Sequence, residues 1–241
     1  MATKAKSEAK PADPRGRIVE ALVSLAGQRR FEDISIRDLC KEAGVSLAEF
    51  RDVFPSKGAV IAGFSRRMDR AVLSDESEAP ADESPRERLF DILMRRLEAM
   101  TPYRDGVREV GAYLRRNPGA ALAMNSVMLN SMRFMMEAAG LHVDGGAAGA
   151  LKTQGLALAW ARIVDVWLDD DDPGLSKTMA EVDRELTRGE RAVAGVDRLT
   201  DLTSPLRGLF QAALDFRRRG SERTARPRDS SDSDAAEAGE S

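Results

Sequence analysis

Apolar residues recur at the three- and four-residue spacing of amphipathic helices along most of the chain, and strand-type alternation is hard to find. Proline and glycine residues interrupt this pattern and divide it into separate helices. The predicted fold class is all-α. After a first helix that begins at Pro14, helices are expected at 36–43, 47–54, 56–73, 86–100, 104–115, 118–139, 147–168, 175–194 and 206–219.

Residues 35–57 contain two short helices joined by a tight turn at Gly44. Ser35 can cap the first helix, and Gly44 stands where a helix commonly ends in a left-handed residue. Ser46 and Glu49 have the capping-box spacing for the second helix. Two helices connected in this way are typical of a helix-turn-helix DNA reader.

The second of these helices has an apolar stripe and a polar face. Its apolar stripe comprises Leu47, Phe50 and Phe54. The face that would enter a major groove carries Ala48, Arg51 and Asp52. Pro55 ends the helix, and Lys57 follows in the first turn of the next one, where a long cation can reach a DNA phosphate.

At these positions the chain resembles the TetR/AcrR family of bacterial transcription regulators, over about the first seventy residues. The matching positions are Arg15, Ile18, Ala21, Leu25, Phe31, 36–39, 43–46, Phe54, Ser56 and Lys57. The resemblance implies that Arg37 contacts the DNA backbone and that Lys57 binds a phosphate. The remaining DNA-binding residues that it implies are Ser46, Leu47, Ala48, Arg51 and Asp52.

The chain departs from the family in its recognition helix. The family usually has a small residue and Thr or Pro in the first turn and then Tyr, where this chain has Ala48, Glu49 and Arg51. Arginine suits a phosphate or a guanine, whereas Glu49 and Asp52 oppose the attraction to the phosphate backbone. The alternative is a helix pair kept only for packing.

Composition fits a soluble, intracellular protein and places the basic charge at the end with the motif. Residues 1–74 hold 14 Lys and Arg against 10 Asp and Glu, although the whole chain has a net charge of −3. The only cysteine, Cys40, lies on an apolar helix face and is expected in the core. No apolar run is long enough to span a membrane, and the start lacks a signal-peptide core, so a cytoplasmic location is expected.

The sequence divides into four regions. Residues 1–13 and 220–241 have no apolar period and are expected to be a disordered arm and a disordered tail. Residues 14–73 are the expected DNA-binding domain. Residues 84–219 are the expected helical ligand-binding and dimerisation domain, in which family resemblance assigns 147–168 and 175–194 to a homodimer interface.

Methionines concentrate in the helix at 118–139, and such flexible side chains suit either an adaptable pocket or an ordinary core. Resemblance to TetR regulators implies an effector cavity in this domain, which would favour a lipophilic ligand. The candidate pocket residues are Met94, Met124, Met128, Met132 and Trp160.

A second resemblance involves 166–186 and 206–219, which look similar to coenzyme Q biosynthesis accessory proteins, lipid-binding proteins with a TetR-like fold. Arginines at 217–219 beside an apolar face suit peripheral contact with an anionic membrane. A C-terminal helix docked on its own domain is the other interpretation.

No catalytic, metal or cofactor site is expected. His142 is the only histidine and is far in sequence from Cys40. The acidic run 169–172 can collect a cation or cap the helix after it. The sequence therefore predicts a TetR-type repressor that binds double-stranded operator DNA as a homodimer and responds to a small effector, with a membrane-associated accessory protein of ubiquinone biosynthesis as the alternative.

Overall fold

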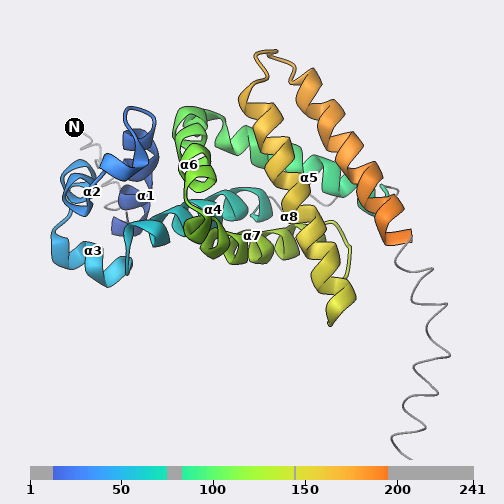
Figure 1. The fold of residues 1–241 in the computed structure, drawn as a ribbon, viewed down its shortest axis with the longest axis horizontal. Coiled ribbons are helices and arrows are strands. Elements are labelled where there is room, and N and C mark those ends of the chain that lie inside the picture. Colours follow the sequence, from blue (N-terminus) through green and yellow to red (C-terminus); the bar gives the residue numbers. More distant parts are fainter. Residues whose placement is uncertain (1–12, 75–82, 144, 195–241) are drawn as a thin grey trace, which may run out of the picture. The chain divides into compact units, whose positions relative to one another are not determined.

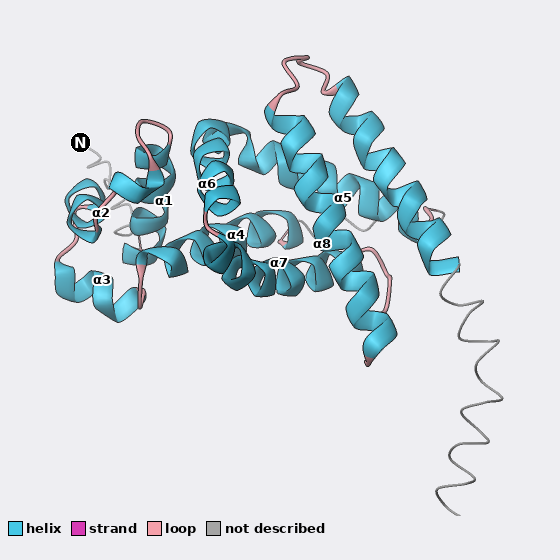
Figure 2. Ribbon diagram, in the orientation of Figure 1, coloured by secondary structure: helices cyan, strands magenta, loops and turns pink. Residues whose placement is uncertain are grey.

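A computed structural model describes residues 13–74, 83–143 and 145–194. Regular structure in these ranges is helical and includes no strand, which confirms the all-α prediction (Figure 2). The predicted arm and tail, apart from Asp13, and the predicted helix at 206–219 lie outside the described residues. None of the described helices is long and apolar enough to cross a membrane.

The first part of the fold is a compact group of three helices, drawn in blue in Figure 1. Helix α1 covers Pro14–Ala26, and its first turn is capped by Asp13, whose side chain accepts from the amide of Arg15. A short 3-10 turn, η1, follows at Phe31–Asp33. Helices α2 (Ile36–Ala43) and α3 (Leu47–Val53) then form the pair that the sequence predicts.

The remaining helices match the predicted spans to within a few residues. Helix α4 (Lys57–Leu73) leads away from the helix pair and packs against α1, α5 and α7. Ser84 and Glu87 form a capping box at the start of the next helix. The later elements are α5 (Pro85–Met100), η2 (Thr101–Tyr103), α6 (Arg104–Arg116), α7 (Pro118–Ala138), α8 (Ala147–Leu168) and a helix at 176–194.

One continuous hydrophobic core runs through both predicted domains. It includes residues of α1 to α5, α7 and α8 and of the helix at 176–194. Helix α6 packs directly against α1, and Gly106 lies against the backbone of α1. A Cβ atom at this glycine would lie 2.4 Å from the carbonyl oxygen of Val23. The division into a DNA-binding and a ligand-binding domain stays a prediction.

Gly106→Ala should destabilise the protein, because the added methyl group meets backbone atoms of α1 that cannot rotate away. Overpacking of this kind costs about 1–3 kcal/mol, which exceeds the gain of about 1 kcal/mol that alanine brings to a helix interior. Gly111→Ala in the same helix is the matched control, since the nearest atom to its Cβ would be the end of Arg115 at 3.6 Å. Urea denaturation should show a lower midpoint for Gly106→Ala only. Equal midpoints would contradict the tight α1–α6 contact.

Candidate nucleic-acid interface and helical groove

The turn between α2 and α3 depends on Gly44 and on an arginine of α1. Gly44 has φ 60° and ψ 42°, the left-handed conformation that glycine adopts without strain. Nη1 of Arg17 donates to the carbonyl oxygens of Ala43 and Gly44, each at 3.0 Å. The end of α2 is therefore satisfied by a side chain of the preceding helix, which fixes the direction in which α3 leaves the turn.

Capping boxes are present at the starts of both α2 and α3. The Ser35 side chain accepts from the amide of Asp38, and the Asp38 carboxylate accepts from Ser35. At the start of α3 the amide of Ser46 donates to Oε2 of Glu49 at 2.7 Å. This backbone hydrogen bond lowers the pKa of Glu49. The carboxylate of Glu49 therefore caps the start of α3. This role explains why an acid stands at a position where the family usually has Thr or Pro.

The apolar stripe of α3 is partly as predicted. Phe50 and Phe54 are buried, at 2% and 1% exposure. Leu47 is 56% exposed, so its expected place on the buried stripe is wrong. It is the first residue of α3, and side chains in a helix lean toward the N-terminus, so the leucine projects beyond the core. This exposure leaves Leu47 on the outer surface beside Ala48.

The outer face of α3 is open. Ala48, Arg51 and Asp52 are exposed there, and Arg37 is exposed on α2. The side chains of Arg37, Arg51 and Asp52 form no hydrogen bond or ion pair with the described residues. These charged groups are therefore available to an external partner, unlike those of Glu49 and Arg17. Ser46, by contrast, has its hydroxyl engaged in the cap of α3.

Lys57 has protein partners. Its Nζ donates to the carbonyl oxygens of Phe31 at 2.6 Å and Ile34 at 2.7 Å, with Glu32 farther away at 3.5 Å. The ammonium also lies 4.3 Å from the centroid of the Phe31 ring. Burial lowers the pKa of Lys57. The family resemblance implies a phosphate contact for Lys57. That contact stays a prediction, because the ammonium group here donates to the carbonyl oxygens of η1 and of Ile34, which follows it.

Helix α6 joins the helix-turn-helix region to the rest of the fold through η1. Oε1 of Glu109 accepts from the amide of Phe31 at 3.0 Å, and the Phe31 and Tyr113 rings lie 4.4 Å apart. Arg116 forms ion pairs with Glu32 and Glu109. The carbonyl groups that bind Lys57 and the amide that binds α6 therefore belong to the same short turn.

The other end of α6 holds the end of α8. Arg104 donates to the carbonyl oxygens of Trp167 and Asp170, and Arg108 donates to that of Leu168. The Arg104 guanidinium also lies over the Trp167 ring, 5.2 Å from its centroid. Because cationic side chains satisfy these last carbonyl groups, α8 and α6 are held together at the point where α8 ends.

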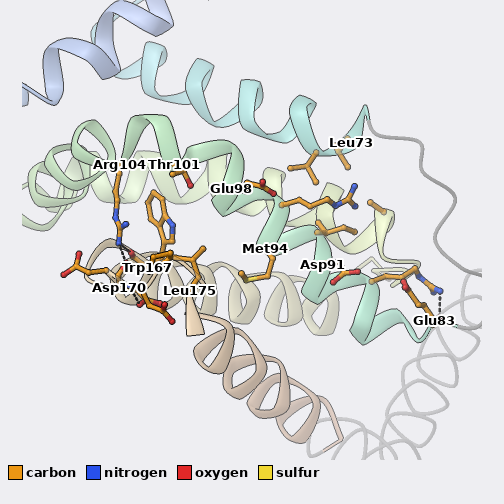
Figure 3. A pocket seen from close by; sticks show the side chains of 18 residues that line it. Leu73, Glu83, Asp91, Met94, Glu98, Thr101, Arg104, Trp167, Asp170 and Leu175 are labelled. Atoms are coloured by element: carbon orange, nitrogen blue, oxygen red, sulfur yellow. Dashed lines mark hydrogen bonds between the residues drawn. The ribbon is translucent and has the colours of Figure 1, made fainter. Parts of the chain in front are cut away.

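A groove of about 810 Å³ lies beside α5, and Figure 3 shows the side chains around it. About half of its lining residues are charged, and most of the others are apolar. Met94 is the only one of the five predicted pocket residues that lines it. The lining residues are Val72, Leu73, Glu83, Arg88, Asp91, Ile92, Met94, Arg95, Glu98, Thr101, Arg104, Ala138, Trp167, Asp170, Asp171, Asp172, Pro173 and Leu175.

The other four predicted pocket residues lie in and beside the core. Met132 and Trp160 are buried, at 0% and 3% exposure. Met124 and Met128 are half-buried and pack against the core from α7. Met128 and Trp160 contact Arg96, a buried cation that the sequence analysis missed. Arg96 falls on the apolar stripe of α5 formed by Leu89, Ile92, Leu93, Leu97 and Met100.

The acidic run 169–172 caps the helix that follows it. Asp170 accepts from the amide of Thr178 at 2.9 Å, and Asp172 accepts from the amide of Ser176 at 3.2 Å. This is the second of the two interpretations that the sequence left open. In the described ranges, no group of three or more His, Cys, Asp and Glu side chains is placed to hold a metal ion.

Helix α8 has an exposed face with large apolar residues. Leu151 and Leu158 are 58% and 51% exposed, and Gly155 between them is also exposed. On the helix at 176–194, Met179 is 39% exposed. A helix with so few polar residues is typically buried on several sides, but within one chain this face is uncovered.

Comparison with known proteins shows the fold. A TetR transcriptional regulator from Nitrosomonas europaea matches with a TM-score of 0.59 and 23% identity, over 74% of this chain and 99% of that one. One from a Rhodococcus species matches with a TM-score of 0.53 and 18% identity, over 73% of this chain and 95% of that one. No family model matches the sequence. No curated protein matches it either. The chain thus has a TetR-like fold.

Proposed function

We propose that this protein is a DNA-binding transcription regulator of the TetR type. The observation that carries the proposal is the outer face of α3, where Arg51 and Asp52 are exposed and free of partners among the described residues. The core side of the same helix is fixed by Phe50 and Phe54. A short, firmly held helix with an open polar face is what base reading in a major groove requires. The other proposed contacts are Arg37, Ser46, Leu47 and Ala48.

Binding sites selected from random duplex DNA should converge on one sequence, and the promoter region beside the protein's own gene should be protected in footprinting. Arg51→Ala should then weaken specific binding by roughly 5- to 150-fold, because a bidentate arginine–guanine contact contributes about 1–3 kcal/mol. Affinity for random DNA should fall much less, since phosphate contacts dominate nonspecific binding.

Arg191→Ala is the matched control, because it removes one exposed arginine from the helix at 176–194. It should change neither specific nor random binding. A specific affinity that Arg51→Ala leaves intact would remove Arg51 from the interface. A chain that selects no sequence even at low salt would contradict the whole proposal and favour a helix pair retained for packing.

The proposed regulator is a homodimer that meets its partner through the exposed face of α8. The support is the pair Leu151 and Leu158 on that face, with Gly155 between them, since small residues let helices approach closely and exposed apolar patches mark interaction sites. Light scattering should give twice the chain mass of 26.3 kDa. Leu151→Lys with Leu158→Lys should give a monomer, and a chain mass for the unmodified protein would contradict the dimer.

Control by a small lipophilic ligand, with repression in its absence, completes the proposal. The support is the connection of α6 to η1 at Glu109 and to α8 at Arg104, so that a shift of α8 acts on the helix-turn-helix region. A ligand that binds two arrangements of these helices unequally would shift their populations and change DNA affinity by at most that ratio. Derepression of the adjacent promoter when the gene is deleted is the expected result, and lost expression would indicate an activator.

The alternative is a membrane-associated, lipid-binding accessory protein of ubiquinone biosynthesis. It depends chiefly on 206–219, which lies outside the described residues, so DNA binding is the better-supported function. Mass spectrometry of lipid extracted from the purified protein separates the two. Isoprenoid lipid together with liposome flotation that needs 206–241, and no selected DNA sequence, would reverse the order.

A further inference from the structure

A buried cation lies where α4, α5, α7 and α8 meet. Arg96 of α5 is 2% exposed, and its Nη2 lies 2.9 Å from Oδ1 of Asp69 on α4. The same nitrogen donates to the hydroxyl of Ser65 at 3.1 Å, and Ser131 of α7 donates to Asp69 at 2.6 Å. The guanidinium lies 4.7 Å from the ring centroid of Trp160 on α8. One carboxylate therefore already neutralises this charge.

The guanidinium has donors for which the described residues supply no strong acceptor. Of its three nitrogens, Nη2 meets both Asp69 and Ser65, while the contact of Nη1 is the sulfur of Met128 at 3.9 Å, a weak acceptor. Nε is buried and has no acceptor among the described residues. An unpaired buried donor costs free energy that a suitable acceptor recovers. Nε and Nη1 of Arg96 can therefore donate to an oxygen atom of a ligand.

The surroundings of these donors are apolar and adaptable. Met132 is buried, and Met128, one turn earlier on α7, is half-buried and contacts the guanidinium. Methionine is unbranched and changes rotamer readily. Rotation of Met128 would give a molecule access to Nη1. The ring of Trp160 lies against the guanidinium and supplies a flat apolar wall.

The charge balance selects the kind of acceptor. A ligand carboxylate would place a second anion beside one cation in the core, and an uncompensated buried charge is costly. A neutral carbonyl oxygen accepts from Nε or Nη1 and leaves the Arg96–Asp69 pair neutral. We propose that Arg96 anchors a neutral, largely apolar ligand through a carbonyl-type oxygen, in a site bounded by Met128, Met132 and Trp160.

This inference rests on the proposed control of DNA binding by a ligand, and it names the class of that ligand. Asp69 and Ser65 belong to α4, which begins at Lys57 directly after the helix-turn-helix. An oxygen that draws the guanidinium toward itself weakens its hold on α4. Ligand binding and the position of α4 are therefore linked through one side chain.

Calorimetry on the full chain tests the site with three probes of similar shape: benzophenone, diphenylmethane and diphenylacetate. Benzophenone should bind about tenfold more tightly than diphenylmethane, as expected for one additional hydrogen bond to a charged donor. Diphenylacetate should bind no more tightly than diphenylmethane. Arg96→Lys keeps a cation for Asp69 but removes Nε, so it should abolish the preference for the ketone and leave diphenylmethane binding unchanged.

Arg86→Lys is the matched control, because it makes the same change on α5 at an arginine that is paired with Asp183, outside this cluster. It should retain the preference. Equal binding of ketone and hydrocarbon, tightest binding of the acid, or a preference that survives in Arg96→Lys would overturn the proposal. If Arg96→Lys does not fold, irradiation of bound benzophenone decides instead: attachment to the peptide that contains Met128 is expected, and attachment only elsewhere overturns the site. None of these measurements uses DNA. A failure of the ligand site can therefore be distinguished from a failure of the proposed DNA binding.

Discussion

Arg96→Met should lower the free energy of unfolding by about 3–5 kcal/mol, the usual cost of removing one partner from a buried ion pair. Methionine fills similar space, so loss of volume contributes little. The cost arises because the carboxylate of Asp69, which is only 8% exposed, keeps its hydrogen bond from Ser131 but loses its cation. Urea unfolding of the purified variant measures the change.

The double variant Arg96→Met with Asp69→Asn should recover most of this loss. Asparagine carries no charge and still accepts from the hydroxyl of Ser131, so no uncompensated anion remains in the core. Asp69→Asn alone should be destabilising too, because it leaves the guanidinium of Arg96 without a counter-ion. Losses that simply add in the double variant would show that the two side chains do not act as a pair.

Local signals in the sequence predicted the helix-turn-helix well. A capping box such as Ser46 with Glu49 involves residues three apart, and the left-handed end of α2 needs only Gly44, so neither depends on distant parts of the chain. The same holds for the helix spans that proline and glycine delimit. The identities of the exposed α3 residues also followed from helical periodicity, except for Leu47 at the helix start.

Contacts between distant segments could not be predicted in this way. Arg96 falls on the apolar stripe of α5, but its position in the sequence does not reveal that Asp69 lies opposite it. The groove beside α5 depends on how α4 and the loop after α8 approach that helix, which periodicity does not determine. The hydrogen bonds from Lys57 to the carbonyl oxygens of Phe31 and Ile34 depend on the path of the backbone at η1, which lies 23 to 26 residues earlier in the sequence.

Lys57→Met should destabilise the protein by about 3 kcal/mol, since two short hydrogen bonds from a charged donor are lost and each contributes about 1.5–3 kcal/mol. The carbonyl oxygens of Phe31 and Ile34 then lose a partner in a half-buried position. Methionine retains the apolar stem that lies over the Phe31 ring, so packing changes little. Urea unfolding gives the stability, and Lys41→Met on the exposed face of α2 is the control that should leave it unchanged.

DNA binding of the same variant separates an architectural lysine from a phosphate contact. Because the ammonium holds η1, and η1 also binds α6 through Glu109, its loss should weaken specific binding by displacing α3. The dependence of log affinity on log salt should keep its slope, since a residue that touches no phosphate releases no counterion. A slope that falls by about 1 would instead assign Lys57 to the phosphate backbone, as the family resemblance implies. In that case the ammonium must leave the carbonyl groups of η1 when DNA binds, and DNA binding itself would loosen the contact between η1 and α6.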